Sequence, residues 1–200
     1  MLFVHSAAAD NKIASEVCTI GDVKKGRFKK IDDADRIVRD PERARARTMD
    51  RAVRLLAAKP RSVGELRIRL LEKHWTNEEL VDEILEKLAG YGYLNDLEFS
   101  TSLAASQLRR NPQGKRRLKH TLAQKHLDPQ IINQAAEAAY KAIPEADLID
   151  AAIEKRIRIK GAPRSREEVK KLIDYLLRRG FDFALINEKL AGIIRQSDGE

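Results

Sequence analysis

Cysteine, aromatic residues and long apolar runs are all scarce in this 200-residue chain. The single cysteine, Cys18, has no second cysteine with which to form an intrachain disulfide, which is typical of a reducing compartment. Aromatic residues make up 5%, which excludes a large core of stacked rings, and the abundant Leu, Ile, Val and Ala suit helix-on-helix packing. No run of 18 apolar residues occurs, and the opening MLFVHSAAAD lacks the basic segment of a signal peptide. We therefore expect a cytoplasmic protein that does not associate with membranes.

The motifs of common enzyme chemistry are missing as well. The chain contains neither G-x-x-x-x-G-K-[ST] nor G-x-G-x-x-G, whose backbone cradles nucleotide phosphates, and it contains no H-E-x-x-H. The four histidines are not spaced as zinc ligands with a second Cys or His pair. Paired acids such as Glu78-Glu79 fall in predicted first turns, where they stabilise the helix dipole. We predict no catalytic residues, no metal and no cofactor, and hence a protein that is not an enzyme.

Helix starts and stops punctuate the chain from Asp40 onward, whereas residues 1–40 show no sustained period and are expected to form a mostly flexible arm. The predicted starts are Asp40-Pro41, the capping boxes Ser62-x-x-Glu65, Thr76-x-x-Glu79 and Ser165-x-x-Glu168, Asn95, Asn111-Pro112, Asp128-Pro129, Pro144-Glu145 and Asp182. They predict nine helices and no strand, over residues 41–58, 62–73, 76–89, 95–110, 112–125, 128–142, 144–160, 165–180 and 182–195. In the first helix, the apolar spacing predicts that Ala46, Met49, Val53 and Leu56 are buried.

One apolar pattern recurs about every 50 residues and divides the nine helices into three groups of three. Aligning Leu66 with Leu118 and Leu172, at offsets of 52 and 54, also aligns the turn between the second and third helices. That turn reads Glu-Lys-His-Trp-Thr, Gln-Lys-His-Leu-Asp and Arg-Arg-Gly-Phe-Asp in successive groups. We therefore predict an arm over 1–40 and three-helix repeats over 41–94, 95–143 and 144–196. Each repeat buries too little apolar surface alone, so neighbours must stack.

Charge follows the same register. The net charge of +8 favours a polyanion or an acidic protein surface as partner. Residues 101–127 hold seven Lys/Arg and no acid, and 155–180 hold ten and three, whereas 76–98 hold one and seven and 128–154 one and six. Because equivalent helices of a repeat array occupy equivalent faces, we predict that the basic helices line one side. The alternative is that these charges only keep the protein soluble through pairs along each helix.

The aromatic residues argue against direct reading of nucleic-acid bases. Proteins that read single strands stack bases on exposed rings. Here three rings occupy apolar repeat positions and three flank a predicted turn, so we expect most of them in the core: Trp75, Tyr140, Phe181, Tyr91, Tyr93 and Phe99. Contact with phosphates needs only charge and placement, so the basic segments still allow it.

Three short motifs stand out in this frame. They are the Gly-Tyr-Leu-Asn-Asp-x-x-Phe run from Gly92 to Phe99, the Gly114-x-x-x-Leu118-x-x-x-Leu122 spacing followed by Lys-His-Leu, and the Leu-Leu-Arg-Arg-Gly-Phe run that ends at Phe181. Together they resemble the RecX family of recombinase regulators over about residues 45–195. The chain departs from the family pattern at Ser100, where Ala is usual, and at His74 and His126, where Gly is common in the turn. Gly adopts a left-handed turn more easily than His, but we expect the turns to form.

The resemblance implies an elongated, curved all-α array that binds the RecA nucleoprotein filament and inhibits or modulates strand exchange and ATP hydrolysis by RecA. It also implies weak, sequence-independent DNA binding, and we expect a monomer. The residues predicted to contact the partner or its phosphates are Arg109, Arg110, Lys115, Arg116, Arg117, Lys119, Lys125, Lys155, Arg156, Arg158, Lys170 and Lys171. A second hypothesis is a stand-alone DNA-binding regulator with helix-turn-helix-like units such as 62–89, although the acidic helix over 76–89 suits the major groove poorly.

Overall fold

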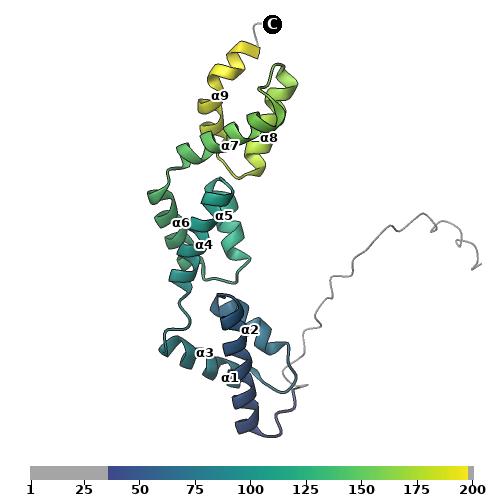
Figure 1. Cartoon of the computed structure of the whole chain (residues 1–200), viewed down its shortest axis with the longest axis vertical. Helices are drawn as coiled ribbons and strands as arrows, with labels where there is room; N and C mark the ends of the chain where they lie inside the picture. Colours follow the sequence, from purple (N-terminus) through teal and green to yellow (C-terminus); the bar gives the residue numbers. More distant parts are fainter. Residues whose placement is uncertain (1–35, 198–200) are drawn as a thin grey trace, which may run out of the picture. The chain divides into compact units, whose positions relative to one another are not determined.

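The structure, a computed structural model, describes residues 36–197 and the side chains of residues 36–191. The predicted arm lies outside the described residues except for residues 36–40, and so does Cys18. Within the described range the chain forms nine α-helices and no strand, as the sequence predicts (Figure 1). The helices are α1 (Pro41–Ala58), α2 (Val63–Leu71), α3 (Glu78–Gly90), α4 (Asp96–Arg110), α5 (Lys115–Ala123), α6 (Pro129–Ala142), α7 (Glu145–Lys160), α8 (Arg166–Arg178) and α9 (Phe183–Ser197).

Capping side chains begin most helices where the sequence predicts them. Ser62 Oγ accepts the N–H of Glu65 at 3.0 Å and so caps α2, and Asn95 and Ser165 cap α4 and α8 in the same way. Two predicted starts are wrong. α3 begins after Asn77, whose Oδ1 accepts the N–H of Leu80 at 3.0 Å, rather than at the neighbouring threonine. α5 begins three residues beyond the predicted Asn-Pro start, after a glycine that offers no side-chain cap.

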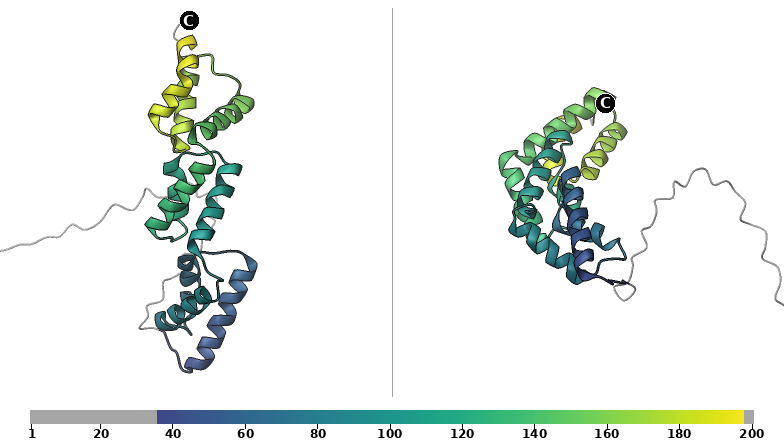
Figure 2. Two further views of the ribbon diagram at one scale, coloured as in Figure 1. Left: turned by 90° about the vertical axis from the view of Figure 1, so that its left-hand side faces the viewer. Right: turned by 60° about the horizontal axis from the view of Figure 1, so that its bottom comes forward.

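The helices pack in three consecutive groups, and the further views in Figure 2 agree with Figure 1 on their membership. α1, α2 and α3 contact one another, as do α4, α5 and α6, and α7, α8 and α9. The first group has its own apolar core, which contains Ala52, Leu66, Leu70, Val81, Ile84, Leu85, Leu88 and Leu94. A second core joins the other two groups, from Ala104 of α4 to Leu190 of α9. Leu66, Leu118 and Leu172 are all buried, as the repeat register predicts.

The first helix buries only part of the predicted face. Met49 and Leu56 are half-buried against the first core, but the predicted burial of the other two residues is wrong. Its buried residues are Ala44, Thr48 and Ala52, whereas Ala46 is exposed and Val53 is 50% exposed. The buried residues are small and spaced by four, which lets α2 and α3 approach the α1 backbone closely. The Thr48 hydroxyl is satisfied there because it donates to the Ala44 carbonyl at 2.8 Å. Size therefore selects the buried face of α1 more strongly than the apolar pattern does.

The first and second groups meet through a close backbone contact. The start of α2 lies against the turn between α5 and α6, so that a Cβ on Gly64 would come within 2.4 Å of the His126 carbonyl oxygen. The Ser62 hydroxyl donates to the Lys125 carbonyl in the same turn. His126 has a φ of 54°, so the turn forms with histidine in the left-handed region, as expected.

The second and third groups meet in the equivalent way. The start of α5 lies against the turn between α8 and α9, where the Gly114 N–H donates to the Arg179 carbonyl at 3.0 Å. A Cβ on Gly114 would come within 2.1 Å of the Gly180 carbonyl oxygen, so only glycine fits. Gly180, the counterpart of His126, also has a positive φ, of 84°. The repeat therefore extends to the contacts between groups.

The chain just before α1 is anchored by Arg36. Its guanidinium donates to the carbonyls of Leu71 at 2.7 Å, Lys73 at 2.9 Å and Thr76 at 3.2 Å. The first two carbonyls lie at the end of α2, where the helix has no further N–H groups to satisfy them. A cation at this position also opposes the partial negative charge of the helix end. Residues 36–40 are thereby tied to the first group.

Candidate functional site

The twelve cations predicted to contact a partner lie at the surface, nine exposed and three half-buried. Two have carboxylate partners. Lys125 Nζ lies 2.9 Å from Glu65 Oε1, and Lys115 Nζ lies 3.8 Å from Glu145 Oε2. The other ten form no ion pair with any residue that the structure describes. This surface therefore carries positive charge that the described fold leaves uncompensated.

Positive charge is densest at the start of α5. Residues 115–117 fill the first turn with cations, and Lys119 follows. The turn contains no acid, and Gly114 supplies no cap, so the partial positive charge of the free N–H groups adds to that of the side chains. Glu145 offsets part of it by accepting the backbone N–H of Lys115 at 3.1 Å. Cations in a first turn are unfavourable by themselves, so this end of α5 is suited to contact with negative charge.

The first group differs, because acids of its third helix pair with cations of its two basic helices. Arg67 of α2 lies 2.8 Å from Asp82 and 3.0 Å from Glu78, both on α3. These hydrogen bonds raise the pKa of the Arg67 guanidinium above its ordinary value. Arg45 of α1 reaches Glu83 at 3.0 Å. The alternating charge of the sequence therefore forms ion pairs in the first group and leaves free cations in the second.

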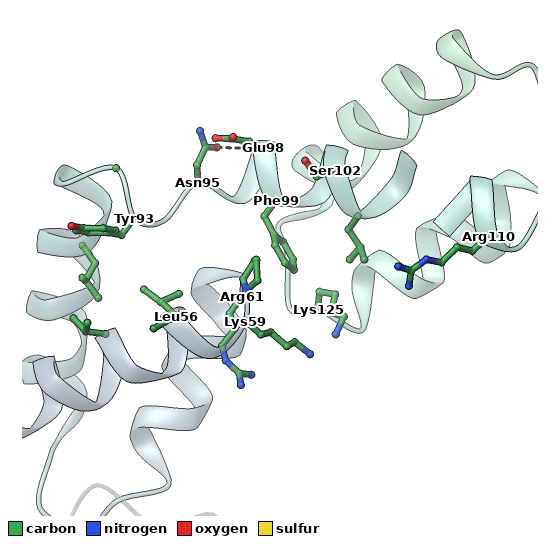
Figure 3. A pocket seen from close by; sticks show the side chains of 16 residues that line it. Leu56, Lys59, Arg61, Tyr93, Asn95, Glu98, Phe99, Ser102, Arg110 and Lys125 are labelled. Atoms are coloured by element: carbon green, nitrogen blue, oxygen red, sulfur yellow. Dashed lines mark hydrogen bonds between the residues drawn. The ribbon is translucent and has the colours of Figure 1, made fainter. Parts of the chain in front are cut away.

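A groove of about 1060 Å³ lies where α1, the α3–α4 link and α4 meet (Figure 3). Its apolar lining includes Val53, Leu56, Phe99 and Leu103, and its cations are Lys59, Arg61, Arg110 and Lys125. Figure 3 shows Leu56 and Phe99 between Tyr93 at one end and Arg110 and Lys125 at the other. Apolar walls beside cations suit a protein segment with apolar and acidic side chains. Of these cations, the sequence predicted only Arg110 and Lys125, because the groove arises from contacts between groups.

The remaining predicted residues are distributed over other surfaces. Arg117 lines a concavity formed by the second and third groups, and Arg156 and Lys171 line another, beside the link between α7 and α8. Arg116 and Lys119 are exposed on α5 and make no side-chain hydrogen bond within the described structure. The structure therefore does not gather the twelve residues into a single pocket.

The aromatic residues divide between core and surface. Tyr140 and Phe181 are buried, as predicted. The core prediction is wrong for Tyr91 and Tyr93, which are 70% and 69% exposed in the link between α3 and α4. Trp75 is half-buried and belongs to neither apolar core, and cations from α1 and the preceding turn lie over its ring. The first group therefore presents exposed aromatic rings that a partner can contact.

Known protein families match this chain one three-helix group at a time. RecX family models match the first three-helix domain at residues 49–88, the second at 95–135 and the third at 144–190. The chain belongs to the RecX family. Regulatory protein RecX of Chlorobium phaeobacteroides is 34% identical over 149 residues, which cover 74% of this chain and 95% of that protein. Regulatory protein RecX of Chlorobaculum tepidum is 32% identical over 147 residues, with coverage of 74% and 88%.

Solved RecX structures share the all-helical repeat fold. The crystal structure of RecX from Lactobacillus salivarius matches with a TM-score of 0.63 and 21% identity, over 80% of this chain and 99% of that one. A second RecX crystal structure matches with a TM-score of 0.64, over 76% and 73%. In this RecX family member, no helix among the described residues is long and apolar enough to cross a membrane. Nor do three or more metal-binding side chains gather within that part of the chain.

Proposed function

We propose that this RecX family member is a regulatory protein that binds the RecA nucleoprotein filament and inhibits its recombinase and ATPase activities in recombination and DNA repair. It acts in the cytoplasm as a monomer, and it contacts DNA weakly and without sequence preference. The relatives named regulatory protein RecX support the regulatory role. The charge and the groove of this chain support the choice of partner.

The uncompensated basic surface of the second group is the observation that carries this proposal. Residues 101–127 contain seven cations and no acid, and only Lys115 and Lys125 find carboxylates in the described structure. Free cations gain most from a partner with closely spaced negative charges, as a nucleoprotein filament offers. Contacts repeated along a filament add through effective concentration, so each can be weak.

The groove beside α4 supports a protein component in the partner. Phosphates need only cations, whereas the apolar side chains of Val53, Leu56 and Leu103 gain free energy when a partner's apolar side chain covers them. Charge beside an apolar patch is the arrangement of a protein interface with a polar rim. A filament that presents both protein and nucleic acid satisfies both features of the surface.

The stand-alone DNA-binding hypothesis has weaker support. Its recognition helix would be α3. In that helix Glu78 and Asp82 form ion pairs with Arg67, and Glu83 forms one with Arg45. A recognition helix in the major groove offers donors to base edges and cations to the adjacent phosphates. An acidic helix engaged in ion pairs repels the phosphates instead. We therefore do not propose sequence-specific duplex binding.

The double variant Arg116→Glu/Lys119→Glu tests the filament proposal. Both side chains are exposed and make no hydrogen bond within the described structure, so helicity by circular dichroism should be unchanged. Arg117 is left in place because its Nη1 donates to the Arg178 carbonyl at 2.9 Å. We expect half-inhibition of RecA ATPase on single-stranded DNA to require about tenfold or more of the variant, because two attractive contacts become repulsive.

Arg43→Glu/Lys141→Glu is the matched control. Both side chains are exposed, lie outside residues 101–127 and form no ion pair with any described residue, so the net charge changes equally while the basic surface stays intact. The control should inhibit RecA like the wild type. Equal inhibition by both double variants would show that the surface is wrongly assigned. A wild-type protein without effect on RecA ATPase, or a footprint on one duplex sequence without RecA, would refute the filament function.

A further inference from the structure

The two junctions between consecutive groups are built alike but carry different charges. Glu65 in the first turn of α2 and Lys125 in the turn after α5 form an ion pair of 2.9 Å across the first junction. The repeat register, with its offsets of 52 and 54, places Arg117 at the position of Glu65 and Arg179 at the position of Lys125. One junction thus pairs an acid with a cation, whereas the other sets guanidinium groups at both equivalent places.

Backbone contacts hold these arginines in the same junction. The Gly114 N–H donates to the Arg179 carbonyl at 3.0 Å. A Cβ on Gly180 would lie 2.6 Å from the backbone nitrogen of Arg117, which shows how closely the two backbones approach. Arg117 Nη1 also donates to the Arg178 carbonyl at 2.9 Å. The backbones of both arginines are therefore held in this junction, and their positive charges stay at its edge while the second and third groups remain packed.

A concavity of about 450 Å³ opens at this junction. Its lining includes three arginines, Arg117, Arg178 and Arg179, and three amide side chains, Gln107, Asn111 and Gln113, and it contains no carboxylate. None of the three arginines has an ion-pair partner among the described residues. Gln113 is 3% exposed, and its side-chain nitrogen has no acceptor within the same part of the chain. Buried donors normally have partners, so this amide gains a hydrogen bond when it turns toward an anion in the concavity.

We infer that the junction between the second and third groups is a binding site for a phosphate group. Guanidinium groups present parallel N–H donors that match the oxygens of a phosphate, and amide nitrogens add donors for the remaining oxygens. The bound anion stands to Arg117 and Arg179 as Glu65 stands to Lys125 in the first junction. Either the backbone of a nucleic-acid strand or a free phosphate compound can supply this group. The inference rests on the proposed DNA contact and assigns it a site, and it is tested without RecA, so that its failure is distinguishable from failure of the filament function.

The variant Arg117→Glu provides the sharpest test, because it installs the carboxylate that the first junction already contains. We expect a melting temperature close to that of the wild type, because pairing of the new acid with Arg179 offsets the lost hydrogen bond to the Arg178 carbonyl. Binding is measured on the full chain at low salt, with pyrophosphate by calorimetry and with a fluorescein-labelled oligothymidine by anisotropy. The variant should bind about tenfold or more weakly than Lys141→Glu, an exposed α6 position with the same charge change.

Two further variants keep the test decisive if Arg117→Glu unfolds. Arg117→Gln removes the charge without adding an acid and should show a smaller loss of affinity at unchanged helicity. Glu65→Arg gives the first junction the charges of the second. It should lower the melting temperature, and pyrophosphate should restore part of that loss because the anion then bridges the new cation and Lys125.

Each outcome assigns or rejects the site. Arg117-dependent binding of oligothymidine without binding of pyrophosphate assigns it to a nucleic-acid strand, whereas Arg117-dependent binding of pyrophosphate assigns it to free phosphate compounds. Equal affinities of Arg117→Glu and Lys141→Glu for both probes would overturn the inference, as would a wild-type chain that binds neither probe. Neither result depends on whether the protein inhibits RecA.

Discussion

Whether a cation in this chain is paired or free depends on the residues that pack against it rather than on the charge of its own helix. Arg67 and Arg116 both belong to basic helices, yet Arg67 has two carboxylates within 3.0 Å and Arg116 has none among the described residues. The sequence shows both as positive charges in basic segments. The partners of Arg67, Glu78 and Asp82, reach it only through the packing of α2 on α3. Counting charges therefore predicted the basic surface but not which of its members are free.

Glu83 should make stability depend on pH. Hydrogen bonds from Lys87 and Arg45 hold the pKa of its carboxyl below the ordinary value. An acid with a lowered folded-state pKa stabilises the fold above its unfolded pKa, about 4.3, and this contribution is lost as the pH falls through the folded-state value. Glu83→Gln should therefore lower the melting temperature near pH 7 by a few degrees at most, and the loss should be smaller near pH 2, because it diminishes as the pH falls through the folded-state pKa of Glu83.

Glu86→Gln is the control for this pH dependence. Glu86 is exposed on the same helix and forms no ion pair with any described residue, so its substitution should leave the melting temperature unchanged at both pH values. Thermal unfolding of the three proteins at the two pH values provides the measurement. A loss at Glu83→Gln that is the same at both pH values would mean that packing, not charge, explains it.

At the scale of helices, local sequence signals predicted most helix starts. They failed where a contact with a residue far along the chain determines where the helix begins. Ser62 and Ser165 cap their helices as predicted, because each offers a side-chain oxygen to the first turn. Residues 111–112 carry a comparable start signal, yet the chain continues to Gly114 before α5 begins. There the backbone packs against Gly180 of the next group. No local motif records that contact, so neither the start of α5 nor the arginine concavity beside it could be predicted.

Gly114→Ala should test this contact between groups. The added Cβ would lie 2.1–2.4 Å from backbone atoms of Gly180 and Phe181, which cannot move aside as a side chain can. We expect a loss of about 1–3 kcal/mol in the free energy of unfolding, as for overpacking of a close contact. Denaturation in urea measures it. A variant as stable as the wild type would show that the second junction is open in solution.

Gly90→Ala is the control for the glycine prediction. A Cβ at this position meets no atom within 4 Å, and the residue ends α3 with an ordinary φ. Alanine reduces the conformational freedom of the unfolded chain and favours the helix, so the variant should be more stable by about 0.4–1 kcal/mol. Opposite signs at the two glycines would separate the junction contact from a general effect of replacing glycine.

At the scale of the whole molecule, the described residues contain two apolar cores rather than three. The second and third groups share one core, whereas the first group has its own. Polar contacts link the first group to the second, among them the Val63 N–H that donates to Asp96 at 2.8 Å and the ion pair between Glu65 and Lys125. Burial raises the pKa of the Asp96 carboxyl, so desolvation opposes part of this link. Each such contact contributes little net stability, because water replaces it on opening.

The first group should therefore unfold separately from the other two, and equivalent leucines can show it. Leu66 and Leu118 occupy the same repeat position, are both fully buried and lie in different cores. Leu→Ala at either position should cost about 2–5 kcal/mol in the core that contains it. Hydrogen exchange should then rise in α1–α3 alone for Leu66→Ala and in α4–α9 alone for Leu118→Ala, because local stability follows the shared core. Faster exchange along the whole chain in both variants would mean that the three repeats unfold as one unit.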